Sequence, residues 1–194
     1  MSAISEMITQ QVAGKVASQI APRLGISENT ARTAVTLAVP LILAALARNA
    51  AQPQGAQELH QAVKQDHDGS VLDNLMGYLG NPEAANGAGI LRHTLGGQRP
   101  TVENNLAQAT GLDQNSAGSL LEMVAPLVMG AIGRQQQENG LDPQGLSQYL
   151  GDQQQQVQNA DPGLMGALNS MLDSNRDGSV SDDLSRIAGN FFKR

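Results

Sequence analysis

The sequence predicts an all-α fold, a compact helical bundle with two long, proline-interrupted helices at its centre. One reason is the composition: 40% of the 194 residues are hydrophobic, yet there are only two Tyr, two Phe and no Trp. A core of Leu, Ile, Val, Met and Ala favours close packing of helices, whereas strands favour β-branched and aromatic side chains. The other reasons are helical spacing of the apolar residues and an internal repeat.

The chain repeats one stretch of sequence. Residues 25–49 align with residues 111–135 without a gap, and HDGSVLDNL at residues 67–75 is echoed by RDGSVSDDL at residues 176–184. Two matching segments in the same order predict duplication of one unit. We therefore predict a single domain over residues 1–194, made of two pseudo-repeats at about 1–86 and 87–194. The identical pairs in the long segment are Gly25/Gly111, Asn29/Asn115, Ala31/Ala117, Pro40/Pro126, Leu41/Leu127, Ala45/Ala131 and Arg48/Arg134.

The first unit begins with a predicted amphipathic helix from about residue 4 to residue 24, which Gly25 ends. Ser27 and Asn29 are candidate caps of the next helix, which is expected to reach about residue 49.

Each long helix contains a proline, Pro40 in the first copy and Pro126 in the second. An interior proline removes one backbone hydrogen bond and clashes with the preceding turn. We expect a kink in both helices, and we expect the two helices to pack together as the core.

Shorter elements follow in the first unit. The sequence predicts a linker at residues 50–55, a helix at 56–64, the DGSV turn, a helix at 71–79 and a loop at 81–89. A short helix at 90–95 is then closed by two glycines.

The second unit carries an insertion. The offset between the copies is 86 residues at the long helix (111 − 25) and 109 at the DGSV turn (176 − 67), so about 23 residues were added. We assign them to the Gln-rich segment 135–158, which contains a short helix and the QQQQ run at 153–156, expected to be solvated or a linker. Helices at 164–172 and 180–192 flank the last turn.

Composition and charge exclude several functional classes. The net charge is −6 with scattered Lys and Arg, so the basic face of a nucleic-acid binder is missing. Zero cysteines exclude disulfides and thiolate zinc sites. No signal peptide is seen at the N-terminus, and the longest apolar run, residues 34–47, is short for a bilayer, which needs about 20 residues. We predict a cytoplasmic protein with no membrane span.

The last DGSV turn matches most of a helix–loop–helix calcium loop. Asp173, Asn175 and Asp177 supply oxygens at places one, three and five, and a glycine occupies place six, where the chain turns sharply. Place twelve holds Leu184 instead of a bidentate Glu, so a neighbouring carboxylate must complete the site. The predicted Ca²⁺ ligands are Asp173, Asn175, Asp177, Ser179 and Asp183.

A purely structural interpretation competes with the metal site. Residues 179–182 (SVSD) also form a capping box, and a calcium loop that ends in a helix start accommodates both. In the first copy Lys64 takes place one, where its ammonium would repel the ion, leaving Asp66, Asp68, Asp73 and Asn74 as oxygen donors. There the capping box at residues 70–73 explains the loop without a metal.

No feature nominates a catalytic centre. The three histidines, His60, His67 and His93, are too far apart in sequence to indicate a ligand set, and His93 is expected to be a hydrogen-bonded structural residue. Nucleophile-elbow, phosphate-loop, zinc-protease and dinucleotide motifs are absent from the sequence. We predict that the protein is not an enzyme and has no catalytic residues; a polar pocket around His93 would favour the opposite view.

Several segments together resemble a known bacterial family. These are GAGILRHTLGG at 87–97, HDGSVLDNL, APLVMG at 125–130 and the terminal DGSVSDDL. They resemble the proteins grouped as domain of unknown function 937, related to YidB. The resemblance implies an all-helical bacterial protein with no established activity to carry over, whose relatives often have a more acidic last loop. Arg92, Asn175 and Arg176 depart from the expected pattern.

These observations give two functional hypotheses. The first is a non-enzymatic scaffold or protein-interaction module that binds an unknown protein partner or self-associates through its Ala- and Gly-rich helices. The alternative is a calcium-binding regulatory or structural protein that uses the C-terminal loop.

Overall fold

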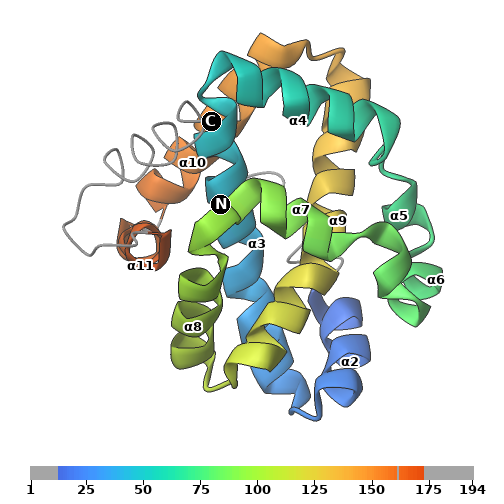
Figure 1. The fold of residues 1–194 in the computed structure, drawn as a ribbon, viewed down its shortest axis with the longest axis vertical. Helices are drawn as coiled ribbons and strands as arrows, with labels where there is room; N and C mark the ends of the chain where they lie inside the picture. Colours follow the sequence, from blue (N-terminus) through green and yellow to red (C-terminus); the bar gives the residue numbers. More distant parts are fainter. Residues whose placement is uncertain (1–12, 161, 173–194) are drawn as a thin grey trace, which may run out of the picture.

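The computed structural model describes residues 13–160 and 162–172, and every regular element in that part of the chain is helical (Figure 1). The predicted all-α class is therefore confirmed. The elements are, in order, α2 (Ala13–Leu24), α3 (Glu28–Ala50), α4 (Pro53–Gln65), α5 (Ser70–Asp73), α6 (Leu75–Gly80), η2 (Pro82–Ala85), α7 (Gly87–Leu95), η3 (Gly96–Gln98), α8 (Arg99–Thr110), α9 (Gln114–Asn139), α10 (Pro143–Ala160) and α11 (Pro162–Leu172).

The two long helices, α3 and α9, cross at the centre of the bundle (Figure 1). Helix α2 packs against α3, α8 packs against α9, and α7 contacts both long helices. At one end α4 contacts both α3 and α9, while α10 covers α3 and α4. The shorter helices therefore enclose the long pair.

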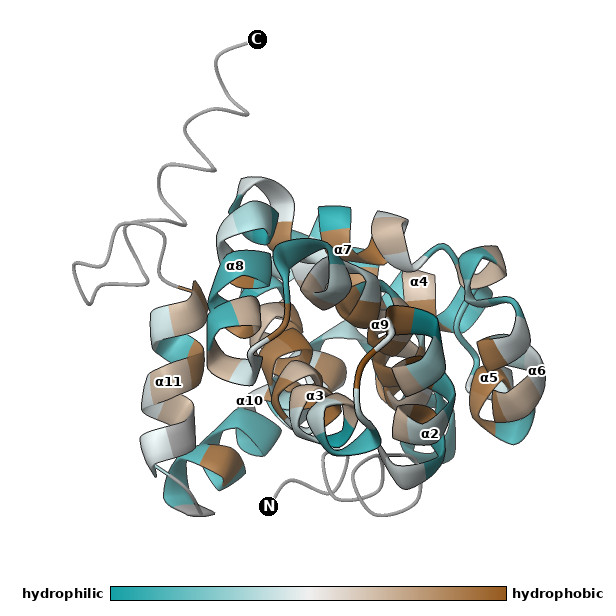
Figure 2. Ribbon diagram, turned by 90° about the horizontal axis from the view of Figure 1, so that it is seen from below, coloured by the Kyte–Doolittle hydropathy of each residue, from teal (hydrophilic) through white to brown (hydrophobic). Residues whose placement is uncertain are grey.

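The core between these helices is aliphatic. Val124, Leu127 and Val128 of α9 are at most 1% exposed, and Leu41 and Ile42 of α3 are equally buried. Tyr78 is the only aromatic residue among the described residues that are buried. Figure 2 shows the same arrangement, with hydrophobic positions facing between the helices and hydrophilic ones on the outside. Small and branched side chains let the helices approach closely, as the composition predicts.

Both long helices would be long and apolar enough to cross a bilayer if judged by length and composition alone. The apolar run at residues 34–47 belongs to a helix of 23 residues, and α9 has 26, so the shortness of that run is not an argument against a span. In this fold 72% and 83% of their most apolar windows are buried, as in core helices. That the chain has no membrane span stays a prediction.

The two halves share local geometry at the offset of 86 residues. Gly25 and Gly111 both have positive φ, +65° and +73°, a conformation that glycine adopts readily. The backbone bond from Ile26 N to Ala21 O (3.0 Å) has its equivalent from Leu112 N to Ala107 O (3.1 Å). The next helix is then capped by Ser27 in one half and by Asp113 in the other. An internal duplication predicts these matches, although the duplication itself stays a prediction.

A second set of matches occurs at the offset of 109. Helices α4 and α11 both begin at a proline, Pro53 and Pro162. Their buried positions also correspond: Ala56/Met165, Leu59/Leu168 and Val63/Leu172. Helix α10 lies between α9 and α11, whereas only residues 51–52 separate α3 from α4. This chain order agrees with an insertion that contains α10.

Several predicted boundaries are wrong. The linker is shorter than predicted, because α4 already begins at Pro53, and the expected loop at 81–89 contains η2 and the start of α7. The helix predicted at 71–79 is interrupted at Asn74, whose side chain caps α6. Gln153, in the QQQQ run, is only 5% exposed and faces the bundle instead of solvent. The predicted proline kinks stay a prediction.

Candidate functional site

The family-like segment HDGS spans the connection between α4 and α5 and the first residue of α5; residues 66–70 are called here the HDGS loop. Gly69 is buried and has φ of +97°, so this turn favours glycine. Oδ1 of Asp68 accepts a hydrogen bond from the backbone N–H of Ser70 at 3.0 Å. Hydrogen bonds from Ser70 lower the pKa of the Asp68 carboxyl, which is fully exposed and ionised at neutral pH.

Two glycines of α9 allow the HDGS loop to approach the helix closely. A Cβ atom at Gly133 would lie 1.8 Å from the carbonyl oxygen of His67. A Cβ atom at Gly130 would lie 2.4 Å from Cγ1 of Val71. Since real Cβ contacts are never that short, only glycine fits at Gly133 without moving the loop backbone.

Two polar side chains of α9 hold the loop in this position. Nη2 of Arg134 donates to the carbonyl oxygen of Gly69 at 3.0 Å and to Oδ1 of Asp73 at 2.6 Å. Nε2 of Gln137 donates to the carbonyl oxygen of Asp68 at 3.2 Å. The loop is therefore fixed through its backbone, which leaves the side chains of Asp66 and Asp68 exposed.

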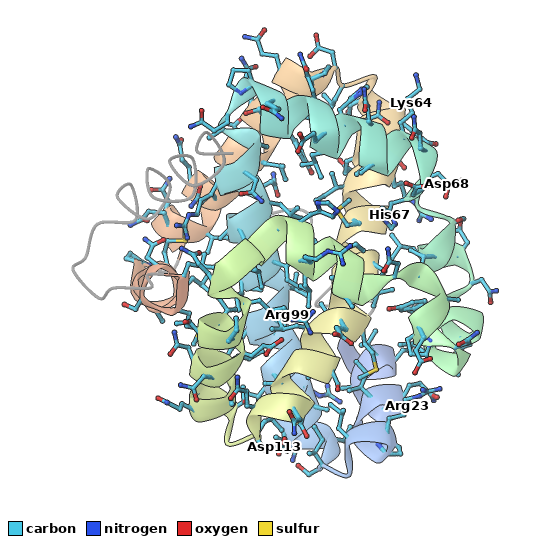
Figure 3. The ribbon with its side chains drawn as sticks, in the orientation of Figure 1. Arg23, Lys64, His67, Asp68, Arg99 and Asp113 are labelled. Carbon is cyan, nitrogen blue, oxygen red and sulfur yellow. The ribbon has the colours of Figure 1, made fainter. Side chains whose placement is uncertain are left out.

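An open hollow lies beside the HDGS loop. The loop, with Asn74 and Tyr78, forms one side, residues 84–86 form another, and Pro126 of α9 contributes to its wall. In Figure 3, His67 and Asp68 lie near the end of α4, alongside α9. This site brings together residues about 60 positions apart in sequence (66 to 126).

Two asparagines line the hollow and cap helices in the same way. Oδ1 of Asn74 accepts from Gly77 N, and Oδ1 of Asn86 accepts from Gly89 N, both at 3.2 Å. In each case a Cβ on the glycine would lie 2.4 Å from the Nδ2 atom of the asparagine. The two Asn-x-x-Gly caps thus fix the orientation of both amide groups.

The hollow is built against the proline of α9. Pro126 has no N–H, so the carbonyl of Glu122 lacks its usual helical donor. The backbone of Gly87 lies against that carbonyl, because a Cβ on Gly87 would be 1.9 Å from it. The hydroxyl of Tyr78 donates to the neighbouring carbonyl of Met123 at 2.7 Å. Burial raises the pKa of Tyr78, so the hydroxyl keeps the proton that it donates.

His67 is the half-buried member of the loop. Burial lowers its pKa, against the opposing effect of the carboxylates of Asp66 and Asp68. The imidazole is therefore neutral at pH 7 and can donate or accept a hydrogen bond.

The other two histidines have different roles. Nε2 of His60 lies 3.1 Å from the carbonyl oxygen of Leu141, so His60 joins α4 to the turn before α10. His93 is exposed, and its backbone carbonyl accepts a hydrogen bond from Nδ2 of Asn49 at 3.4 Å, whereas its side chain has no hydrogen-bond partner within the described residues. The expected structural, hydrogen-bonded role of the His93 side chain stays a prediction.

The predicted calcium ligands Asp173, Asn175, Asp177, Ser179 and Asp183 lie outside the described residues, as does the capping box at 179–182. In the first copy the corresponding oxygens have separate partners. Asp68 accepts from Ser70, Asp73 binds Arg134, and Asn74 caps α6. Over residues 13–160 and 162–172, no three His, Cys, Asp or Glu side chains are grouped as metal ligands would be.

The capping box predicted at residues 70–73 is wrong. Gly69 occupies the N-cap position of α5 and has no side chain to cap it, and Ser70 is instead the first residue of that helix. The carboxylate of Asp73 pairs with Arg134 instead of returning to the backbone of its own helix. Asp73 therefore binds Arg134 of α9 in place of forming the predicted capping box.

Sequence reasoning did not identify the parts of α9 that hold the site. Gly130, Gly133 and Arg134 follow one another at helical spacing, so they lie along the same side of α9. In the sequence Arg134 stands out only as an identical position of the repeat. The glycines were a usable signal, since glycine in a long helix costs stability unless close packing requires it.

Comparison with known proteins gives one match. Residues 6–135 match the family described as bacterial protein of unknown function (DUF937). No curated protein and no solved structure matches the chain. The matched region includes the HDGS loop, the hollow and Arg134, and it ends before α10. The relation to YidB stays a prediction. Because the match covers well over half of its residues, the chain belongs to the bacterial DUF937 family, whose function is unknown.

Proposed function

We propose that this protein is a non-enzymatic helical scaffold that binds a segment of a partner protein in the hollow beside the HDGS loop. The main observation in support is that the HDGS loop packs closely against Gly133 and Arg134 of α9, next to the open hollow. A preformed concave site binds without the entropy cost of ordering a loop.

Several polar side chains that line the hollow already have hydrogen-bond partners within the protein, which supports a binding role over a catalytic one. Asp68 holds the turn, the oxygens of Asn74 and Asn86 cap helices, and Tyr78 donates to the α9 backbone. A catalytic base must instead direct its lone pair at a substrate. These side chains give the hollow its shape.

Its place within the family match also supports this site. All residues that line the hollow fall inside residues 6–135. Helices α10 and α11 fall outside that region. A binding function of the matched part would therefore include the hollow among its surfaces and would not need the Gln-rich helix α10.

Site-specific photo-crosslinking tests the proposal in living bacteria. A photoreactive amino acid replaces Gln65, an exposed residue that lines the hollow, or Asn104, an exposed residue of α8, as the control position. Each is combined with Ala84→Trp, which fills the hollow from η2, or with Ala88→Trp on an exposed position of α7 outside it.

We expect one protein to be crosslinked from position 65, both in the otherwise unmodified chain and in the Ala88→Trp variant. We expect the same crosslinked product to be absent from the Ala84→Trp variant. A product containing two copies of this chain would make the partner a second copy. The proposal fails if Ala84→Trp leaves the crosslinked products unchanged or if position 104 gives the same products.

Calcium binding is the second proposal. It rests on the spacing of oxygen-bearing residues at 173–183, which lie outside the described residues. The geometry described above concerns only the first copy of the loop, so the calcium proposal depends on a direct binding measurement.

A further inference from the structure

We infer that the C-terminal segment DGSVSDDL, residues 177–184, docks on α3 in the way that the HDGS loop and α5 dock on α9. The segment itself lies outside the described residues, so the argument concerns the surface of α3 that receives it. That surface lies around Ala44 and Arg48. The inference does not depend on the partner protein proposed above.

The packing around the two long helices supports this placement. Helices α2 and α8 each contact both α3 and α9. Helix α4 contacts α9, and α11, its counterpart at the offset of 109, contacts α3. Figure 1 shows α5 and α6 on one side of the long pair and α11 on the other. The helix before each DGSV turn therefore lies against the long helix of the opposite half.

The end of α11 is held on α3 by an arginine. Nη1 of Arg48 donates to the carbonyl oxygen of Leu172, the last residue of α11, at 3.5 Å. At the repeat offsets Arg48 corresponds to Arg134, and Leu172 corresponds to Val63 in the last turn of α4. In that half a Cβ on Gly133 would lie 3.3 Å from the carbonyl oxygen of Val63. Corresponding positions of the two long helices thus meet the ends of corresponding helices.

The DGSV turn is within reach of the same arginine. Only residues 173–176 separate α11 from it, and the matching residues 64–67 bring the first copy onto α9. Arg134 donates to the carbonyl of Gly69 and to the carboxylate of Asp73. The corresponding acceptors are the carbonyl of Gly178 and the carboxylate of Asp182. We assign both acceptors to the guanidinium of Arg48.

An apolar groove beside α3 fits the valine of the turn. Pro40 and Ala44 of α3 form one wall of the groove, and apolar side chains of α10 and α11 form the others. In the other half Val71 packs against Gly130, since a Cβ there would lie 2.4 Å from its Cγ1 atom. Val180 corresponds to Val71, and Ala44 corresponds to Gly130. Docking at the same register therefore places Val180 at the groove.

Two alanines make this contact looser than the one on α9. Ala44 and Ala47 occupy the positions of Gly130 and Gly133. Their methyl groups hold the turn further from the helix than the HDGS loop lies from α9. The long side chain of Arg48 spans the added distance.

Disulfide trapping in the full-length protein tests the placement, because the chain contains no cysteine of its own. The first test pair is Ala44→Cys with Val180→Cys. The second pair, Ala47→Cys with Arg176→Cys, samples the same register, so a folding defect in one pair leaves the other. Ala84→Cys with Val180→Cys is the control, since Ala84 is exposed in η2, which contacts α6 and α9.

We expect both test pairs to form a disulfide within one chain under mild oxidation. The rate should be at least about tenfold above that of the control pair, because docking raises the local concentration of the two thiols. Faster or equal trapping at the exposed control position overturns the inference. Disulfides that join two copies of the chain also overturn it, because they place the segment on a second molecule.

An arginine variant tests the assigned contact in the same assay. Arg48→Ala, added to the first test pair, should slow trapping about fivefold, the effect of one lost hydrogen bond. Arg32→Ala should leave the rate unchanged, since Arg32 pairs with Glu28 on the exposed face of α3. Equal rates with the two arginine variants would show that Arg48 does not hold the segment.

Discussion

Nη2 of Arg134 lies 2.6 Å from Oδ1 of Asp73, so a residue near the end of α9 binds the short helix that follows the HDGS loop. The same nitrogen also donates a hydrogen bond to the carbonyl oxygen of Gly69 at 3.0 Å. The side chain of Asp73 is 74% exposed, which limits the strength of the ion pair. The bond to the Gly69 carbonyl is the better protected contact.

Removal of this contact should loosen the loop more than it destabilises the fold. We expect Arg134→Ala to lower the free energy of unfolding by about 1 kcal/mol, the usual net worth of such a hydrogen bond. Hydrogen exchange at residues 66–70 should increase more than elsewhere. Arg32→Ala is the control, because Arg32 pairs with Glu28 on the exposed face of α3 and should change stability by less than about 0.5 kcal/mol. Equal exchange in both variants would contradict the role of Arg134.

The close approach at α9 can be tested with a single methyl group. Gly133→Ala should destabilise the protein by about 3 kcal/mol, because its Cβ would meet a backbone oxygen that cannot turn away. Gly151→Ala on α10, where a Cβ would meet nothing within 4 Å, should instead be neutral or stabilise by up to about 1 kcal/mol. Urea unfolding of both variants measures the difference. A harmless Gly133→Ala would show that the loop does not lie on α9 as described.

The anchor at the proline of α9 gives a third prediction. Tyr78→Phe removes the buried hydrogen bond to the carbonyl of Met123 and should cost about 1 kcal/mol. Tyr149→Phe is the control, since its hydroxyl makes a longer contact of 3.3 Å to Gln135 in a half-buried position. Thermal and urea unfolding should show a clearly larger loss for Tyr78→Phe. The reverse order would argue that Tyr78 is not anchored to α9.

Stability should fall in mildly acidic solution because of His67. Burial lowers the pKa of His67 in the folded state below its ordinary value of 6.5. The unfolded chain therefore takes up the proton first. The contribution of the neutral ring to the free energy of unfolding is complete above pH 6.5 and is lost progressively as the pH falls below that value.

The His67 effect can be separated from that of the carboxylates. Asp68, whose pKa is lowered from 3.8, loses its contribution only when the pH falls below that value. His67→Gln should flatten the dependence of the urea midpoint between pH 7 and about pH 5 relative to the unmodified protein. An unchanged slope would show that His67 is not the responsible group.

Calcium binding is tested by calorimetry on the full-length protein. If the C-terminal loop holds Ca²⁺, titration should give heat that Asp177→Ala removes, because Asp177 occupies place five of the loop. Asp68→Ala changes the corresponding position of the first copy and should leave the heat unaffected. No heat at about millimolar calcium would reject the site.

The fold class could be predicted from composition and repeats, because both are properties of the sequence itself. The long helices were located by Pro40 and Pro126, and Gly25 and Gly111 marked the turns before them. The break at Asn74 could not be predicted from the apolar pattern around it. There the side chain offers a local cap, and the loop's contact with α9 fixes the direction of the next helix.

The candidate site was only half visible in the sequence. The HDGS segment stands out because its DGSV turn at residues 68–71 recurs at residues 177–180, but recurrence does not reveal a long-range partner. The contacts of Gly69 with Gly130 and Arg134 join residues more than 60 positions apart, which no local propensity encodes. In α3 the positions matching Gly130 and Gly133 are Ala44 and Ala47, so the glycine pattern of α9 is not repeated in the first copy.

The most direct test of the account is the affinity of the captured partner for two tryptophan variants. Ala84→Trp and Ala88→Trp add the same bulk to neighbouring exposed positions, but only Ala84 lines the hollow. We predict that Ala84→Trp weakens binding at least about tenfold, a change of about 1.4 kcal/mol, and that Ala88→Trp leaves it unchanged. Equal affinities for the two variants would contradict a binding site in the hollow.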